Sequence, residues 1–292
     1  MPDSPGNERL FGASRTEERC TTRSFPMSPE ESVRAGNLSQ ALQDLQQRVR
    51  SNPGDAKSRI FLYQLLAVLG QWERAATQLK VATDLDASTL ILGEVGRQAL
   101  QAEQARAHVF SGSTTPLLMG EPAPWLALLL EALRLSAQGH FEKAAELRGQ
   151  ALQDAPTNAG TLNGEKFGWL ADADSRMGPC LEIIIDGKYL WAPFNRIKSL
   201  RIEPPADLQD VVWAQAIITW ANEGQSPALI PARYAGTEAS DDDALKLSRR
   251  TDWVSKPGET WLGVGQRMLA TDGGEYPLLE TREIVFDAIS CA

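Results

Sequence analysis

The chain has 292 residues, of which 42% are hydrophobic and 23% are charged, and its formal net charge is −9. A nucleic-acid partner requires a basic face that releases counterions from phosphate, so this acidic balance argues against one and favours a protein partner with a basic or apolar recognition segment. Three scattered cysteines, without a CxxC pair or a Cys/His cluster, support neither a zinc site nor a disulfide framework and are typical of a reducing cytoplasm.

The N-terminal segment has the composition of a leader. Residues 1–26 mix Pro, Gly, Ser, Arg and Glu without an apolar core, which excludes a secretory signal and predicts a disordered leader. Folded structure is expected to start at Met27. The longest apolar run, Trp125 to Leu130, is far shorter than the roughly 20 residues that cross a membrane. We therefore expect a soluble, cytoplasmic chain without membrane insertion.

Three similar strings organise the first half: GNLSQA, GQWERA and GHFEKA, which begin at Gly36, Gly70 and Gly139. The first two lie 34 residues apart and the last two 69, about twice that distance. A 34-residue period of helix, Gly-containing turn and helix resembles the tetratricopeptide repeat (TPR), in which small residues let antiparallel helices approach closely. The large residue of each string is expected to wedge between the paired helices: Leu38, Trp72 and Phe141. Residues 27–160 are therefore predicted to form a TPR-like helical domain.

The repeat expected near residue 104 is degenerate. Its string, EQARAHVFSGSTTPLLMG, is predicted to contain a loop. The next hairpin is expected to open at Pro122 and Pro124, because proline is tolerated in a first helical turn.

The hydrophobic period changes after residue 160. Asp186-Gly187 lies between two apolar runs and predicts a hairpin with a type I′ turn, which needs positive φ at both central residues. Three further apolar segments predict short strands, and residues 240–254 have helical spacing with acids in the first turn. The segment that begins at Gly265 predicts a final hairpin. Residues 161–292 are thus expected to form a mostly antiparallel, small barrel-like β domain with a short helix, which makes the whole chain α+β.

A polar cluster lies between the two halves, in WLADADSRMGPCLEIIIDGKYLWAP (169–193). Paired carboxylates such as Asp172 and Asp174 serve as acid and base, or hold a metal, only when a substrate or a full ligand set lies between them. The string lacks the later bidentate glutamate of a calcium loop. The chain has only two histidines and no G-x-S-x-G, Walker or GxGxxG motif, so no enzymatic constellation is indicated. We expect these acids and Arg176 to brace a turn.

The residues around this cluster resemble the signature of the ImpE family, also called SciE-type or TagJ proteins. The pattern comprises an aromatic residue followed by Trp, a D-x-D-x-R-x-G-P-x-L-E segment and an aromatic hairpin. Its members in this chain are Trp169, Asp172, Asp174, Arg176, Gly178, Pro179, Leu181, Glu182, Gly187, Tyr189, Trp191 and Pro193. Further similarity lies in IPARYAGTE (230–238), TDWV (251–254) and the segment from Gly265 to Phe286.

The resemblance implies a non-enzymatic, cofactor-free cytoplasmic adaptor of a bacterial type VI secretion system. Family members bind the N-terminal helical segment of the small contractile-sheath subunit. They are thereby linked to sheath assembly or to its recycling by a ClpV-type AAA+ unfoldase. The alternative function is a general TPR-like scaffold outside secretion, and genes for sheath, baseplate and AAA+ proteins beside this one would favour the first.

Two surfaces are candidates for binding such a partner, because an amphipathic helix docks on apolar anchors rimmed by charge. The favoured one is the helical half, with Tyr63, Trp72 and Trp125 as anchors, although Trp72 also fits a core position. The opposing hypothesis places the partner on the β-rich half, beside Trp191 and Trp213.

Overall fold

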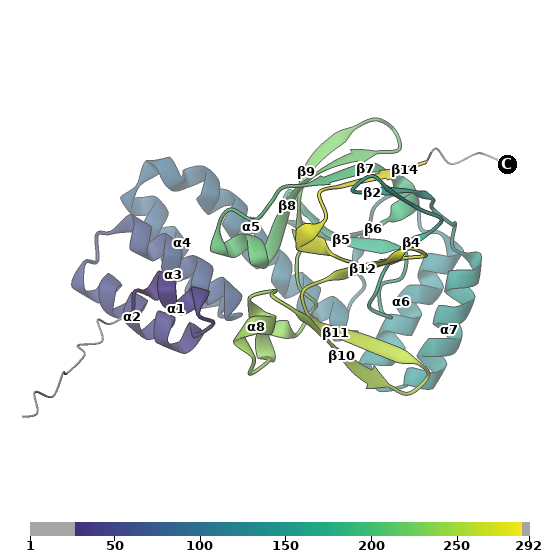
Figure 1. The fold of residues 1–292 in the computed structure, drawn as a ribbon, viewed down its shortest axis with the longest axis horizontal. Helices are drawn as coiled ribbons and strands as arrows, with labels where there is room; N and C mark the ends of the chain where they lie inside the picture. The colour runs from purple at the N-terminus through teal and green to yellow at the C-terminus, as the bar shows by residue number, and fades with distance from the viewer. Residues whose placement is uncertain (1–26, 288–292) are drawn as a thin grey trace, which may run out of the picture.

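The computed structural model describes residues 27–287 and divides them between helical hairpins and an extended sheet (Figure 1). The leader predicted for residues 1–26 lies outside the described residues. The helices are α1 (Pro29–Arg34), α2 (Leu38–Ser51), α3 (Ala56–Val68), α4 (Trp72–Leu85), α5 (Leu90–Phe110), α6 (Pro124–Ala137), α7 (Phe141–Asp154) and α8 (Asp243–Lys246). None of these is long and apolar enough to cross a membrane.

The repeat-like hairpins are confirmed. α1 packs on α2, α3 on α4 and α6 on α7, and each turn contains its predicted glycine with a left-handed φ: +76° at Gly36, +68° at Gly70 and +82° at Gly139. The second helix of each pair has 14 residues and starts at the predicted wedge residue. A residue with a Cβ is strained at such a φ, which explains why glycine recurs at this point of each unit.

The degenerate repeat contains a longer helix than expected. α5 runs for 21 residues and ends at Phe110, so the predicted loop begins only after it. That loop consists of turns, bends and the two-residue strand β1 (Leu117–Leu118). α6 then begins at Pro124, in the first-turn position predicted for it.

The strands form three sheets. The largest has nine strands in the order β1-β6-β5-β9-β8-β7-β14-β2-β3, all antiparallel except for β1 beside β6. The other two are β10-β11 and β13-β12-β4. The bounds are β2 (Gly160–Leu162), β3 (Glu165–Phe167), β4 (Leu170–Asp172), β5 (Cys180–Ile185), β6 (Lys188–Pro193), β7 (Ile197–Ile202), β8 (Trp213–Trp220), β9 (Gln225–Pro231), β10 (Thr251–Lys256), β11 (Thr260–Gly265), β12 (Met268–Thr271), β13 (Gly274–Pro277) and β14 (Glu283–Phe286).

The predicted Asp-Gly hairpin joins β5 to β6. Ile185 pairs with Lys188, and the two residues between them have φ of +48° and +72°, as a type I′ turn requires. The closing segment also forms its hairpin, β12–β13, but its last strand, β14, leaves that pair and joins β7 and β2 in the large sheet.

Two sequence expectations need correction. The large sheet does not close into a barrel within the described residues, since β1 and β3 are its free ends. The helix expected over 240–254 is limited to the four residues of α8, and Thr251–Lys256 instead pairs with β11 as strand β10. Tertiary pairing overrides the local helical spacing there.

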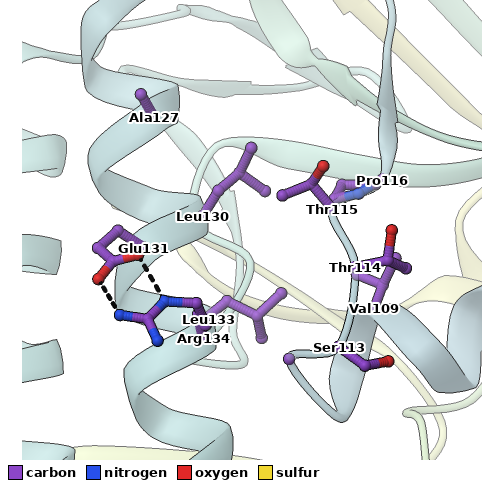
Figure 2. Close-up of a pocket in the computed structure, with 11 residues that line it drawn as sticks. Val109, Ser113, Thr114, Thr115, Pro116, Ala127, Leu130, Glu131, Leu133 and Arg134 are labelled. Atoms are coloured by element: carbon purple, nitrogen blue, oxygen red, sulfur yellow. Dashed lines mark hydrogen bonds and ion pairs between the residues drawn. The ribbon is translucent and has the colours of Figure 1, made fainter.

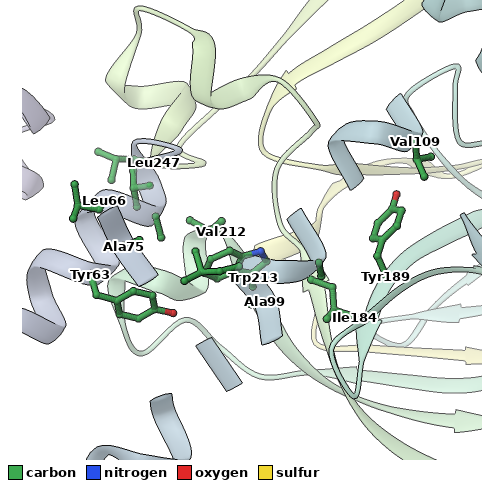
Figure 3. Close-up of a cluster of buried hydrophobic side chains, with 14 of the residues drawn as sticks. Tyr63, Leu66, Ala75, Ala99, Val109, Ile184, Tyr189, Val212, Trp213 and Leu247 are labelled. Carbon is green, nitrogen blue, oxygen red and sulfur yellow. The ribbon is translucent and has the colours of Figure 1, made fainter. Parts of the chain in front are cut away.

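A hydrophobic core crosses the predicted boundary at residue 160. One cluster of buried side chains contains Tyr63, Leu66 and Ala99 from the helices together with Ile184 and Trp213 from the sheet (Figure 3). The buried side chains of a second cluster lie within residues 162–286 and join strands of the large sheet to Leu170, Leu269 and Leu278. The division into domains at 27–160 and 161–292 stays a prediction, and the first cluster shows that the two parts pack as neighbours.

Candidate functional site

The signature stretch forms β4, a tight loop, β5 and β6. Asp172 ends β4, Asp174 and Arg176 lie in the loop, and Glu182 is on β5. Gly178 has a φ of +56°, and Phe194 donates its backbone N–H to the carbonyl of Pro179 at 3.0 Å, which closes the loop against the end of β6. The three carboxylates are buried, and the Arg176 side chain is mostly buried.

Asp174 ties the loop to β11. Its Oδ1 accepts from the backbone N and the Nε of Arg176, both at 2.8 Å, and its Oδ2 accepts from Arg176 Nη2 at 2.5 Å. The same Oδ2 accepts from the backbone N of Gly263 at 2.7 Å. Both carboxylate oxygens are therefore occupied by donors of the chain itself.

Asp172 and Glu182 are held together by one arginine, Arg267. Its Nη1 donates to Asp172 and its Nη2 to Glu182, while its Nε donates to the carbonyl of Pro231 at 2.9 Å. Asp172 also accepts from the backbone N of Asp174 at 2.8 Å and from the Tyr234 hydroxyl at 3.1 Å.

The network extends from the sheet into helix α5. Glu182 accepts from Arg106 Nε at 2.6 Å and from the Tyr189 hydroxyl at 2.6 Å. Arg106 also contacts Glu103 at 3.4 Å and donates to the backbone carbonyl of Arg233 at 2.8 Å. The indole of Trp213 donates to Glu103 at 2.8 Å. The charged members of the network, four acids and four arginines, are buried or nearly so: Glu103, Asp172, Asp174, Glu182, Arg106, Arg176, Arg233 and Arg267.

Arg233 is held without a carboxylate. Its guanidinium donates to the carbonyls of Val68 at 2.7 Å and Ala67 at 3.1 Å, at the C-terminal end of α3, and to the carbonyl of Lys246 at 2.8 Å. These carbonyls carry the negative end of the helix dipole and favour a cation. Burial nevertheless lowers the pKa of Arg233 to about 10.

The pKa values of the two central carboxyl groups, Asp172 and Glu182, are shifted in opposite directions. Burial raises the pKa of Asp172 to about 6, and the single guanidinium of Arg267 offsets this only in part. Burial also penalises the charged form of Glu182, but Arg106 and Arg267 together outweigh it and lower the pKa of Glu182 to about 2. Glu182 is thus the anionic centre that two arginines share.

This arrangement suits structural bracing. Each of the three signature carboxylates is filled by internal donors and shielded from solvent, so a substrate has no access to it in this conformation. Among residues 27–287, no group of three or more His, Cys, Asp or Glu side chains is placed to hold a metal ion. His108 lies 3.3 Å from the hydroxyl of Ser113, but that hydroxyl also donates to the His108 carbonyl at 2.9 Å and caps α5.

The hairpin aromatics of the signature belong to the same network, whereas Trp169 does not. Trp191 donates its indole N–H to the Tyr189 hydroxyl at 2.7 Å, and both side chains are buried. The φ of +72° at Gly187 allows the turn between β5 and β6. Trp169 is 43% exposed on the surface beside β4.

The aromatic residues predicted to anchor a partner mostly face inward. Tyr63, Trp125, Trp191 and Trp213 are buried, and Trp72 is half-buried with its ring 6.0 Å from that of Trp213. In this conformation the four buried residues offer no side-chain surface to a partner, because they supply the contact between helices and sheet. The pairing of Trp72 with Trp213 joins residues that the two opposing surface hypotheses kept apart.

The sequence did not predict the role of several residues of the network. Arg233 and Arg267 lie in the strings IPARYAGTE and GQRMLATDGG. The resemblance of these strings to the family was the one feature that could have drawn attention to the two arginines. Glu103 and Arg106 lie in the degenerate repeat, where no pattern distinguished them from surface charges of an amphipathic helix.

A hollow lies between α6 and the segment after α5 (Figure 2). It has a volume of about 510 Å³ and is lined by Val109, Leu130, Leu133 and the Ser113–Pro116 segment. Its charged residues, Glu131 and Arg134, pair with each other at 2.5 Å, so they offer no free charge to a ligand. This hollow lies apart from the signature carboxylates.

The protein belongs to the α+β class. Its TPR-like hairpins pack against an open, mostly antiparallel sheet, and the two parts share a hydrophobic core and a network of buried ion pairs. A family model described as ImpE protein matches residues 164–285. The type VI secretion system accessory component TagJ of Pseudomonas aeruginosa PAO1 is 49% identical over 264 residues, which cover 90% of this chain and 92% of TagJ. The chain therefore belongs to the ImpE family.

The fold is also found in a solved structure. The X-ray crystal structure of a protein from Vibrio parahaemolyticus matches with a TM-score of 0.81 and 25% identity, over 89% of this chain and 97% of that one. The match includes both the helical hairpins and the sheet, because it covers nearly the whole of each chain.

Proposed function

We propose that this chain is a non-enzymatic, cytoplasmic accessory protein of a bacterial type VI secretion system. The observation that carries the proposal is the 49% identity to TagJ across 90% of the chain. The aligned residues include both the helical hairpins and the sheet, and the name of this relative states an accessory role in type VI secretion. The alternative of a general scaffold outside secretion has no comparable observation in its favour.

The proposed activity is capture of the N-terminal helical segment of the small sheath subunit. Through this contact the chain acts in sheath assembly or in recycling by a ClpV-type AAA+ unfoldase. An adaptor needs a stable surface and no reactive group, and the signature acids, which are neutralised inside the molecule, agree with this requirement.

Calorimetric titration tests the proposal. The full chain is titrated with a synthetic peptide of the N-terminal segment of the small sheath subunit from the same bacterium, and with a scrambled peptide of equal composition. We expect saturable binding of the first peptide alone. Equal heats for both peptides, or no binding of either, would contradict the proposed function.

Recycling and assembly are separated by a second measurement. If the chain delivers the sheath subunit to the unfoldase, a ClpV-type protein should co-elute with the chain only when the sheath subunit is present. Co-elution of the chain and sheath subunit that excludes the unfoldase would favour the assembly role.

A further inference from the structure

An apolar groove runs between helix α5 and the β8–β9 face of the large sheet. Two hollows of about 340 and 240 Å³ share Val95, Gln215 and Leu229 in their walls, so they form one continuous groove. From Ile91 to Gln98 the helical wall extends about 10 Å at 1.5 Å per residue.

The sheet wall of this groove follows from strand pairing. Gln215 of β8 lies opposite Leu229 of β9, and Ile217 lies opposite Pro227, so these four side chains share one face. The neighbouring positions, such as Ala214 and Ile218, point to the buried face. The side of the sheet that faces α5 is therefore left partly uncovered along the groove.

The helical wall exposes more apolar surface than a solvent-facing helix normally does. Ile91 is 81% exposed and Val95 is 40% exposed, and they lie four residues apart on one side of α5. Leu90, which is 58% exposed, lines a separate hollow between α4 and α5. Exposed apolar side chains are common singly, but a contiguous set beside a groove marks an interaction site.

The charges of the groove all have one sign. Its charged lining residues are Asp186, Glu203 and Asp207, and no Lys or Arg among residues 27–287 lines it. Glu203 has a 3.6 Å contact with Arg201, but both side chains are more than half exposed, so this pair is weak. The chain as a whole carries −9, which adds to the negative potential.

We propose that this groove binds a basic amphipathic helix of a partner protein, with its apolar face on Ile91, Val95 and Leu229 and its Lys or Arg side chains toward the acids. Helix-in-groove recognition uses this combination of apolar floor and charged rim. A second copy of this acidic chain is disfavoured as occupant by like-charge repulsion. The inference rests on the proposed function, since the sheath-subunit segment serves as the probe.

Two variants test the apolar and the acidic parts of the groove. Ile91→Lys places a cation on the exposed apolar ridge and should raise the Kd for the sheath-subunit peptide at least about tenfold, as loss of an interface anchor does. Asp186→Asn combined with Glu203→Gln removes two charges and keeps the hairpin, because Asn-Gly also favours a type I′ turn. This variant should weaken binding at 50 mM NaCl and flatten the increase of Kd between 50 and 500 mM NaCl.

The matched controls lie on helix α7, away from the groove (Figure 1). Leu152 is 47% exposed, so Leu152→Lys repeats the apolar-to-cation change, and Glu142→Gln with Asp154→Asn repeats the loss of two exposed acids. Both controls should keep the wild-type Kd and its salt dependence.

The outcomes separate the groove from the proposed function. Wild-type binding with an unchanged Kd in both groove variants overturns the groove and leaves the function standing. Absence of wild-type binding overturns both. If Ile91→Lys instead converts a dimer to a monomer in sedimentation while Kd is unchanged, the groove holds a second copy and the proposal fails.

Discussion

Asp174 illustrates at the scale of one residue why the signature acids matter for folding. Its carboxylate accepts four hydrogen bonds, three from Arg176 and one from the backbone of Gly263 on β11. We expect Asp174→Asn to lower the free energy of unfolding by about 3–5 kcal/mol, because it leaves the largely buried Arg176 charge without its partner. Urea denaturation followed by fluorescence measures this.

The surface acid Asp154, at the end of α7, provides the matched control. Asp154→Asn should change the free energy of unfolding by less than about 0.5 kcal/mol. An Asp174→Asn variant that keeps wild-type stability but no longer functions in secretion would contradict the bracing role and point to a direct one.

Glu182 gives the network a predictable dependence on pH. Its pKa falls from the ordinary 4.5 to about 2 in the folded chain, so it contributes stability above pH 4.5 that is lost as the pH falls toward 2. Glu182→Gln should therefore be less stable than the wild type by about 3–5 kcal/mol near neutral pH. The difference should shrink steadily between pH 4.5 and 2.

Denaturation of both proteins across this pH range measures the effect. The contribution of Asp172 to stability depends on pH in the opposite direction. Because its pKa is raised to about 6, Asp172 stabilises the fold when protonated, and this contribution is lost as the pH rises through 6. Glu182 is one of the charges that raise the pKa of Asp172, so Glu182→Gln also reduces this Asp172 contribution. A difference that stays constant down to pH 2 would show that Glu182 is not the anion shared by the arginines.

At the scale of elements, the helical hairpins are fastened to the rest of the molecule at their ends. Arg249 donates to the carbonyls of Arg34 and Val33 at the end of α1, at 3.0 and 2.9 Å, and Arg233 does the same for α3. Asp243 of α8 accepts from the backbone N of Leu38 at 2.9 Å, at the start of α2. Residues of the C-terminal part thus satisfy helix-end groups that a free hairpin would leave to water.

The hairpin glycines allow a matched test of this contact. A Cβ at Gly139 meets nothing within 4 Å, whereas a Cβ at Gly70 would lie 2.5 Å from the Cβ of Glu238. Gly139→Ala should cost about 1–2 kcal/mol through its left-handed φ alone. Gly70→Ala should cost clearly more, because the α3–α4 turn must move away from Glu238. Thermal denaturation compares the two, and equal costs would mean that this contact is absent.

At the scale of the whole molecule, the helices and the sheet depend on each other. Trp213 of β8 donates to Glu103 of α5, and Glu182 of β5 is neutralised in part by Arg106. We expect the full chain to unfold in one transition, with coincident circular dichroism and tryptophan fluorescence curves. A fragment of residues 161–292 should lack stable tertiary structure, because Glu182 and the aromatic cluster around Trp213 lose their helical partners.

The same reasoning limits the use of deletions for locating the partner site. Loss of binding in the fragment of residues 161–292 would follow from unfolding alone, so point variants of the intact chain locate the partner site more directly. Two separate unfolding transitions, or a fragment 161–292 with a cooperative melt, would contradict the shared core.

The sequence by itself determined the features that depend on neighbouring residues. The three Gly turns, the Asp186-Gly187 hairpin and the start of α6 at Pro124 follow from local backbone sterics, which act over a few positions. The family signature could also be recognised, although its role as a set of buried ion pairs could only be inferred in outline.

Only the tertiary structure determined which residues distant in the sequence are in contact. Arg106 and Glu182 are 76 residues apart, and Arg267 and Asp172 are 95 apart, so neither pair has a local pattern. The strand at Thr251–Lys256 formed against β11 despite helical spacing, and Tyr63 and Trp213 became core because the sheet covers the helices. Burial and long-range pairing are properties of the assembled fold. For this reason aromatic residues that suggested a binding surface, and acids that suggested a catalytic cluster, are instead buried and hold the helices and the sheet together.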